Sequence, residues 1–279
     1  GLVIADKIMR FEKYEEDSEN VYITVGGGEN WDKVVKRCVE EGLTGIEALS
    51  LIPGTAGATP VQNVGAYGQE IAQTLVSVEA YSLDDDKFVT IQNVDCGFGY
   101  RTSRFKTTDR GKYFITAITL HLRRGDPQPP FYNALQSYLT EHNITTYSPQ
   151  IVRDAVISIR TSKLPDPAKV ANNGSFFANP IVNEEQFTRL RDGYPDIRFW
   201  EMPEGKYKVA AAWLVEKAGF KDVHDQETGM ATWPQQALVL VNEHAKSSAD
   251  VLKFKQKIVG KVSDKFGITL EQEPEYIEL

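Results

Sequence analysis

The segment 53–68 is rich in glycine and alanine, the small residues that let a backbone approach another molecule closely. Amides in such a segment can bind a phosphate or the polar edge of a flat ring. A tightly turned loop without a ligand explains the composition equally well, and no Gly-Lys-Ser or Gly-Lys-Thr follows, so this is not a Walker loop. The glycines at 26–28 lack the GxGxxG spacing of a dinucleotide site, and we predict a strand-to-helix turn there.

Two basic segments could bind an anion. Arg101 follows Tyr100, and an arginine beside an aromatic ring can hold a carboxylate through two hydrogen bonds, although most loop arginines are simply exposed. Arg160 and Lys163 lie three residues apart near the end of a predicted helix, so they can share a face and contact one anion. From the residues alone, we favour the simpler interpretation that these two are solvated charges that offset the helix dipole.

Ser175 follows a glycine and precedes two phenylalanines, which predicts either a shielded hydroxyl donor or a loop serine packed under the ring pair. It is not part of a GxSxG elbow. No triad spacing connects it to a histidine, so a hydrolase is disfavoured; the histidines are His121, His142, His224 and His244. Near the C-terminus, Glu275 follows a proline, and taken alone it is an ordinary solvated acid.

These residues must be positioned by short elements of α+β type. We predict strands at 21–25, 76–80, 88–91 and 118–122, with a polar turn at 84–86. A helix capped by Asn30 ends at Gly42, and Cys38 lies on its apolar face. The opening residues 1–6 are typical of the end of a strand.

A proline-rich connector at 125–130 separates this part from a helix that Ser148 caps. The helix pattern stops at 164–167, where we place a domain boundary. Beyond it we predict a helix from Asn183 to Gly193, a helix at 209–218, a helix from about Ser247 to Gly267, and a buried strand at 237–241. The chain is therefore predicted to have two domains, 1–165 and 166–279.

Composition excludes several classes of protein. The chain has 279 residues, of which 41% are hydrophobic and 25% charged, so it is neither disordered nor collagen-like. No apolar stretch reaches the ~20 residues that cross a bilayer. The net charge of −8 argues against binding a nucleic-acid backbone but allows a small anionic substrate. Two cysteines without a CxxC pair and the lack of a secretory signal favour a reducing cytoplasm.

Six segments, taken together and in order, resemble the UDP-N-acetylenolpyruvoylglucosamine reductase family, known as MurB: IPGTAGATPVQNVGAYG, FGYRTSRFK, RTSKLPDP, NNGSFFANP, PQQALVLVN and EPEY. The resemblance covers nearly the whole chain. It implies an α+β fold with a PCMH/MurB-type FAD-binding domain at 1–165 and a C-terminal α+β substrate-binding domain at 166–279, whose terminal strand returns to the active site. The implied enzyme is a NADPH-dependent UDP-N-acetylmuramate dehydrogenase of peptidoglycan precursor synthesis, with FAD as its cofactor.

The resemblance also implies site residues. Arg101 and a protonated Glu275 match the family's residues at the substrate carboxylate, and Ser175 matches its proton donor. The resemblance implies that the substrate is contacted by Tyr132, Lys163, Asn179 and Gln236. It implies that the UDP phosphates are contacted by Lys208 and Lys221. The cofactor-binding positions, which place the flavin against the small-residue loop, are Pro53, Gly54, Thr55, Gly57, Ala58, Thr59, Gln62, Asn63, Gly65, Ala66 and Tyr67. No metal is implied.

One departure from the family pattern leads to a further expectation. Family members carry an N-terminal segment whose glycine-rich loop binds the FAD pyrophosphate, and Gly1 already aligns after it. We therefore expect a truncated chain that binds FAD weakly or not at all. The other expected partners are a UDP-sugar and NADPH, with no nucleic acid, and the expected state is a cytoplasmic monomer. Alternatives are another FAD-dependent oxidoreductase of this fold, such as an alcohol or sugar oxidase, and a non-catalytic nucleotide-sugar-binding fragment.

Overall fold

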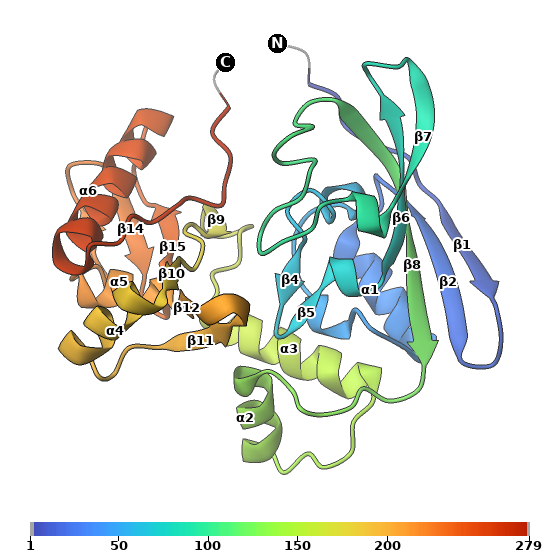
Figure 1. Ribbon diagram of the computed structural model, residues 1–279, viewed down its shortest axis with the longest axis horizontal. Helices are drawn as coiled ribbons and strands as arrows, with labels where there is room; N and C mark the ends of the chain where they lie inside the picture. Colours follow the sequence, from blue (N-terminus) through green and yellow to red (C-terminus); the bar gives the residue numbers. More distant parts are fainter. Residues whose placement is uncertain (1–2, 278–279) are drawn as a thin grey trace. The chain divides into compact units, whose positions relative to one another are not determined.

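The computed structural model describes residues 3–277 and divides into two compact units, Gly1–Arg160 and Thr161–Leu279. Each unit has its own sheet and its own hydrophobic core, and each is described by itself (Figure 1). Helix α3 (Pro149–Lys163) runs across the division, with its last three residues in the second unit.

The first unit is built on a six-stranded antiparallel sheet of order β1-β2-β8-β6-β7, with β3 paired to β8 (Figure 1). A small hairpin of β4 and β5 follows the loop of small residues. The strands are β1 Phe11–Glu15, β2 Asn20–Gly26, β3 Leu43–Thr44, β4 Gly65–Ala66, β5 Gln69–Glu70, β6 Leu75–Ser82, β7 Lys87–Gln92 and β8 Tyr113–Arg124. The predicted strands at 21–25, 76–80, 88–91 and 118–122 are confirmed.

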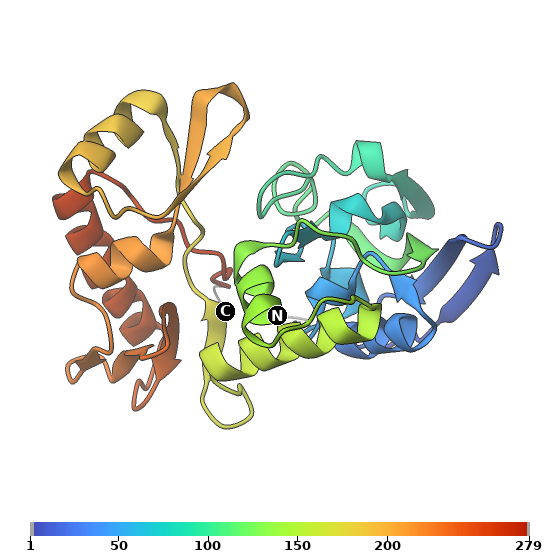
Figure 2. The same cartoon turned by 90° about the horizontal axis from the view of Figure 1, so that it is seen from below.

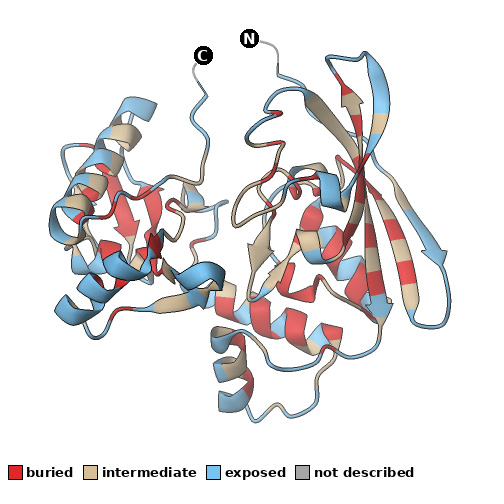
Figure 3. Cartoon of the chain, in the orientation of Figure 1, coloured by how far each residue is buried: buried red, intermediate tan, exposed pale blue. Residues whose placement is uncertain are grey.

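Alternating side chains give the large sheet one buried face. In β2 the residues Val21, Ile23 and Val25 are buried, whereas Tyr22 and Thr24 between them are half-buried, as the banding in Figure 3 shows. Helix α1 (Trp31–Glu40) covers this face, and the side chain of Asn30 caps it by accepting from the Lys33 amide. The predicted cap and helix are confirmed.

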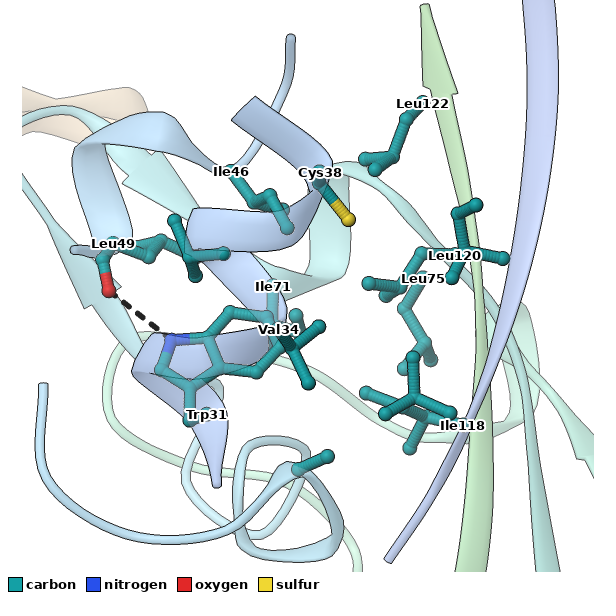
Figure 4. Packing of buried hydrophobic residues seen from close by; sticks show 14 of the residues in the cluster. Trp31, Val34, Cys38, Ile46, Leu49, Ile71, Leu75, Ile118, Leu120 and Leu122 are labelled. Atoms are coloured by element: carbon teal, nitrogen blue, oxygen red, sulfur yellow. Dashed lines mark hydrogen bonds between the residues drawn. The ribbon is translucent and has the colours of Figure 1, made fainter. Parts of the chain in front are cut away.

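Trp31 lies at the centre of the core between α1 and the sheet (Figure 4). Its Nε1 donates to the carbonyl oxygen of Leu49 at 3.1 Å, so the indole is buried with its polar atom satisfied. Cys38 packs in the same core, as predicted, and burial raises the pKa of its thiol to about 12.

Helices α2 (Asn133–Glu141) and α3 form a second, smaller core in the first unit, where they lie side by side (Figure 2). Leu135 and Leu139 of α2 pack with Val152 and Val156 of α3. The side chain of Ser148 accepts from the Ile151 amide at 3.2 Å, which confirms the predicted start of α3. No local signal in the sequence predicts α2.

The second unit combines a four-stranded antiparallel sheet, β13-β14-β15-β9, with a three-stranded one, β10-β12-β11. Its core gathers apolar residues of α5, α6 and β15 around Phe254. The helices are α4 Glu184–Gly193, α5 Ala211–Lys217 and α6 Ser248–Phe266. The strands are β9 Asn172–Ser175, β10 Ile181–Asn183, β11 Phe199–Met202, β12 Lys206–Val209, β13 His224–Asp225, β14 Met230–Trp233 and β15 Gln236–Asn242.

The strongest helix signals are confirmed in this unit. Asn183 and Ser247 each form a capping box, and Gly267 ends α6 in the left-handed conformation, with φ of 66°. Short 3-10 turns connect other elements: η1 Glu47–Leu49, η2 Ala56–Ala58, η3 Ile71–Gln73, η4 Asn93–Asp95 and η5 Pro203–Gly205.

Two boundary predictions were wrong. Val209 was placed in a helix but ends β12, where it pairs with Phe199 and its amide donates to the Pro180 carbonyl at 2.9 Å. The opening of the chain was predicted to end a strand. Residues 3–6 belong to no strand, and residues 1–2 lie outside the described part.

Between residues 3 and 277, no helix is both long and apolar enough to cross a membrane.

Candidate active site

Arg101 is fixed against the β4 turn of the first unit. Its Nη2 donates to the carbonyl oxygen of Gly65 at 2.8 Å, and its guanidinium lies 5.1 Å from the ring centre of Tyr100. The residue has a positive φ of 55°, an uncommon backbone conformation for a side chain of this size. A Cβ on Gly65 would lie 3.0 Å from Nη1, so the absence of a side chain there makes room for the guanidinium.

Asn63 ties the same two loops together from inside the protein. Its Nδ2 donates to Glu70 Oε2 at 2.8 Å and to the Gly99 carbonyl at 3.1 Å, while its Oδ1 accepts from the Ala72 amide at 3.0 Å. The residue is buried. Its side-chain bonds therefore serve to hold the loop that presents Gly65.

The earlier part of the loop, residues 53–59, is bound to the turn that precedes α1. The Gly57 amide donates to the Gly27 carbonyl at 2.9 Å, and a Cβ on Gly57 would lie 3.0 Å from the Cα of Gly27. The amides of Ala58 and Thr59 also donate within the loop. These residues thus offer a closely approachable backbone surface, while their own N–H groups already have acceptors.

Three tyrosines surround the Arg101 turn. Tyr67 and Tyr132 meet edge to face with ring centres 6.2 Å apart, and Tyr132 directly precedes α2. Burial, with a contribution from Tyr100, raises the pKa of Tyr132. Burial also raises the pKa of Tyr67, and the charge of Arg160 partly opposes that shift. The first unit therefore brings together Arg101, Tyr132 and the Gly65–Tyr67 end of the predicted cofactor loop.

The interpretation of Arg160 and Lys163 as two solvated charges was wrong for Arg160. Lys163 is exposed, but the Nε of Arg160 is shielded from solvent and has no acceptor among residues 3–277. Burial lowers the pKa of Arg160, with Tyr67 and Asp32 acting in the opposite direction. Spacing along the helix could not reveal that one residue is shielded and the other exposed, because exposure depends on the tertiary structure around α3.

Sequence reasoning missed the ion pair beside it. Arg153, seven residues earlier on α3, donates from Nη1 and Nη2 to the Asp32 carboxylate at 2.7 and 2.9 Å and from Nη1 to Ser50 Oγ at 2.8 Å. Asp32 also accepts from the Leu51 amide at 2.6 Å. The available signal was Arg153 itself, because a charged residue beside the apolar positions of the predicted helix needs an acidic partner when it is buried.

In the second unit, main-chain bonds join the residues that follow Ser175 to the residues that precede Glu275. Ser175 ends β9 and pairs with Val239 of β15, the strand that begins at Gln236. The next residue, Phe176, accepts at its carbonyl from the Glu273 amide at 2.9 Å. The segment carrying the exposed Glu275 is thus attached to the residues that directly follow the serine.

The other predicted substrate residues of this unit lie on different elements. Asn179 Oδ1 accepts from the Ala211 amide at 2.9 Å, so this side chain also holds the start of α5. Lys208 lies in β12 with its Nζ 5.3 Å from the ring centre of Trp200. Lys221 follows α5 and faces Glu216 at 3.7 Å. The second unit therefore groups Ser175, Gln236 and the Glu275 segment around β9 and β15, and places the two lysines elsewhere.

The residues of the first unit fit a flavin cofactor. The loop packs closely on the 26–28 turn at Gly57, and its small residues leave its backbone open to a flat ring. Arg160 supplies a shielded N–H without an acceptor in the described chain. The chemistry needs no metal ligands, and residues 3–277 contain no cluster of three His, Cys, Asp or Glu side chains suited to a metal ion.

Sequence comparison defines the class of protein. Residues 2–92 match the family model described as an FAD binding domain, which makes the first unit part of a flavin-dependent enzyme. Residues 166–277 match the model described as the UDP-N-acetylenolpyruvoylglucosamine reductase C-terminal domain.

Full-length relatives carry the same name. A UDP-N-acetylenolpyruvoylglucosamine reductase from Cupriavidus pinatubonensis is 43% identical over 252 residues, which cover 90% of this chain and 74% of the relative. One from Amoebophilus asiaticus is 40% identical over 281 residues, covering 100% of this chain and 81% of the relative. The chain belongs to the UDP-N-acetylenolpyruvoylglucosamine reductase family.

A solved structure supports the fold. The crystal structure of UDP-N-acetylenolpyruvylglucosamine reductase (MurB) from Thermus caldophilus superposes with a TM-score of 0.60 at 21% identity, covering 90% of this chain and 71% of that one. The predicted α+β class with FAD-binding and MurB C-terminal domains is confirmed.

Proposed function

We infer that this protein reduces UDP-N-acetylglucosamine enolpyruvate to UDP-N-acetylmuramate with NADPH, a step of peptidoglycan precursor synthesis. The reaction is supported by family membership, since the chain aligns with 74–81% of the length of the two relatives described above. When bound, FAD supplies the transfer of hydride from NADPH to the enol ether. The observation that carries the site proposal is the gathering of Arg101 and Tyr132 at the turn where the loop of small residues ends.

Arg101 is the proposed electrostatic partner of the substrate carboxylate. Hydride addition to the outer alkene carbon leaves negative charge on the carbon beside that carboxylate, and the resulting enolate needs a fixed cation. The bonds that hold the loop and the guanidinium keep the cation in place before the charge develops, so little reorganisation is needed.

Ser175 is the proposed donor of the proton that completes the reduction. A neutral hydroxyl is a weak acid, but the carbon of an enolate is basic enough to take its proton. Glu275 is proposed to act in its protonated form, as a hydrogen-bond donor to the carboxylate. The main-chain bonds between the Glu275 segment and the residues after Ser175 support placing both at one site.

The remaining assignments are proposals of the same kind. We propose that residues 1–165 bind FAD and residues 166–279 bind the UDP-sugar. Tyr132, Lys163, Asn179 and Gln236 would contact the substrate, and Lys208 and Lys221 its phosphates. We also propose that the protein is a monomer and acts in the cytoplasm; both described thiols are free, as is usual in a reducing compartment.

The test is NADPH oxidation by the FAD-loaded, full-length protein with and without the enolpyruvyl substrate, with mass spectrometry of the lactyl product. Ser175→Ala should lower turnover by a factor on the order of 10²–10⁴, while NADPH still reduces the bound flavin at the normal rate. Ser158→Ala, at an exposed position of α3, is the matched control and should be unaffected. Unchanged turnover in Ser175→Ala would reject the proton-donor role.

A further inference from the structure

The Arg160 guanidinium has one nitrogen without a hydrogen-bond acceptor in the described protein. Seven residues earlier on α3, Arg153 has taken both carboxylate oxygens of Asp32, the acid that influences Arg160 as well. The Nε of Arg160 is shielded and has no acceptor among the described residues. A shielded guanidinium N–H without an acceptor costs free energy, because the group has lost its bonds to water.

The surroundings of this charge belong to the cofactor loop. Tyr67, the last residue of the predicted cofactor-binding set, packs against the cluster that contains Ile159, the residue before Arg160 on α3, and the charge of Arg160 acts to lower the pKa of this tyrosine. The same tyrosine contacts Tyr132, which lies beside Tyr100 and the Arg101 turn. Arg160 therefore lies on the α3 side of the loop, within the same unit and separate from the guanidinium assigned to the substrate.

We propose that Arg160 binds the pyrimidine edge of the FAD ring system and stabilises the negative charge that the cofactor holds there when it is reduced. The inference rests on the proposed function and extends it by assigning a second arginine, directed at the cofactor rather than at the substrate. The pyrimidine edge carries carbonyl oxygen and ring nitrogen acceptors, which match the donors of a guanidinium. A cation beside this edge favours the reduced cofactor and so tunes its potential.

A purely structural arginine would behave differently. It would have its hydrogen bonds completed inside the protein, as Arg153 does with Asp32 and Ser50. Replacing it would then destabilise the chain whether or not cofactor is present. A charge kept shielded for a ligand instead lowers the stability of the ligand-free protein, and its removal relieves that cost.

The experiment compares wild type, Arg160→Met and Arg160→Lys in the full-length protein, with Arg123→Gln as a control that removes one exposed positive charge. Three properties are measured: the melting temperature without FAD, the dissociation constant for FAD, and the midpoint potential of the bound flavin. We expect Arg160→Met to melt at or above the wild-type temperature without FAD, to bind FAD about tenfold more weakly, and to shift the potential to a more negative value. Arg160→Lys should recover part of the potential, and Arg123→Gln should match wild type in all three.

The outcomes separate this inference from the proposed function. If wild type takes up no FAD at saturating concentration, the cofactor site is wrong and the inference falls with it. If wild type binds FAD but Arg160→Met has an unchanged affinity and potential, only the role of Arg160 is overturned. A large drop in melting temperature without FAD in both Arg160 variants would show a structural residue and would also overturn it.

Discussion

Arg101 donates from Nη2 to the Gly65 carbonyl at 2.8 Å. A Cβ on Gly65 would lie only 3.0 Å from Nη1 of the same guanidinium. The contact joins two loops that are 36 residues apart in sequence. The position of the proposed catalytic cation is therefore set by a glycine that cannot be enlarged without moving it.

Gly65→Ala should reduce turnover while leaving the fold intact. The new Cβ would lie 3.0 Å from Nη1 and 2.9 Å from Glu70 Cγ, so the guanidinium must shift. A displacement of about 1 Å in a catalytic group can cost on the order of 10²-fold in rate, so the smaller shift that this contact requires should cost less than that. Steady-state kinetics and thermal unfolding measure the two effects. Gly260→Ala, which meets no atom within 4 Å, is the control, and equal turnover in both variants would contradict the prediction.

Asp32→Asn should destabilise the first unit strongly. The Arg153 side chain is only 7% exposed, and its two terminal nitrogens both donate to this carboxylate. Removing one partner of such a pair leaves an uncompensated charge and costs about 3 kcal/mol. Urea unfolding measures the loss. Lys36→Gln, which breaks an exposed pair with Glu40, should cost less than about 1 kcal/mol. Similar losses in the two variants would show that the Asp32 pair is no stronger than a surface pair.

The same aspartate predicts a dependence of stability on pH. Burial acts to raise the pKa of Asp32, but the hydrogen bonds from Arg153 and the Leu51 amide outweigh it and leave the pKa below its ordinary value. A carboxyl with a lowered folded-state pKa stabilises the protein above its unfolded pKa, about 3.9, and loses that contribution as pH falls through the folded value. The stability difference between wild type and Asp32→Asn should therefore shrink below about pH 4. A pH series of unfolding free energies tests this, and a constant difference down to the lowest pH would count against it.

Both described thiols should resist alkylation in the folded protein. Burial raises the pKa of Cys38 to about 12 and that of Cys96 to about 11, so almost no thiolate is present near pH 8. Iodoacetamide labelling followed by mass spectrometry should find neither residue modified in native protein and both modified in guanidinium. Rapid labelling of native Cys38 would show that the core around α1 opens readily.

Elements with strong local signals could be predicted from sequence. Helix α6 has a capping serine, a 19-residue amphipathic run and a terminal glycine, and all three signals agree. Helix α2 has no side-chain cap bond at Tyr132 and buries only Leu135 and Leu139, so its pattern is too weak to recognise. Val209 was misplaced because it belongs to a strand. Its pairing with Phe199 of β11 is a tertiary contact, which the local spacing of apolar residues does not reveal.

The residues of the site could be predicted where a local motif marks them, but not where tertiary packing sets their environment. Motif resemblance indicated Arg101 and the cofactor loop, and the structure places Arg101 against Gly65 of that loop. The environment of Arg160 could not be predicted, because it depends on Arg153 having already taken the carboxylate of Asp32, 121 residues earlier in the chain. Competition between two arginines for one acid is a property of the packed protein.

The attachment of the Glu275 segment has a consequence for thermal inactivation. Leu270 is anchored in the core, but the following residues are held beside β9 by the bonds between Glu273 and Phe176 and between Ala178 and Glu271. Segments held to a sheet by a few hydrogen bonds open before a domain melts. On gentle heating, catalysis is therefore expected to fade while the circular dichroism of the sheets still reports a folded molecule, and to return on cooling.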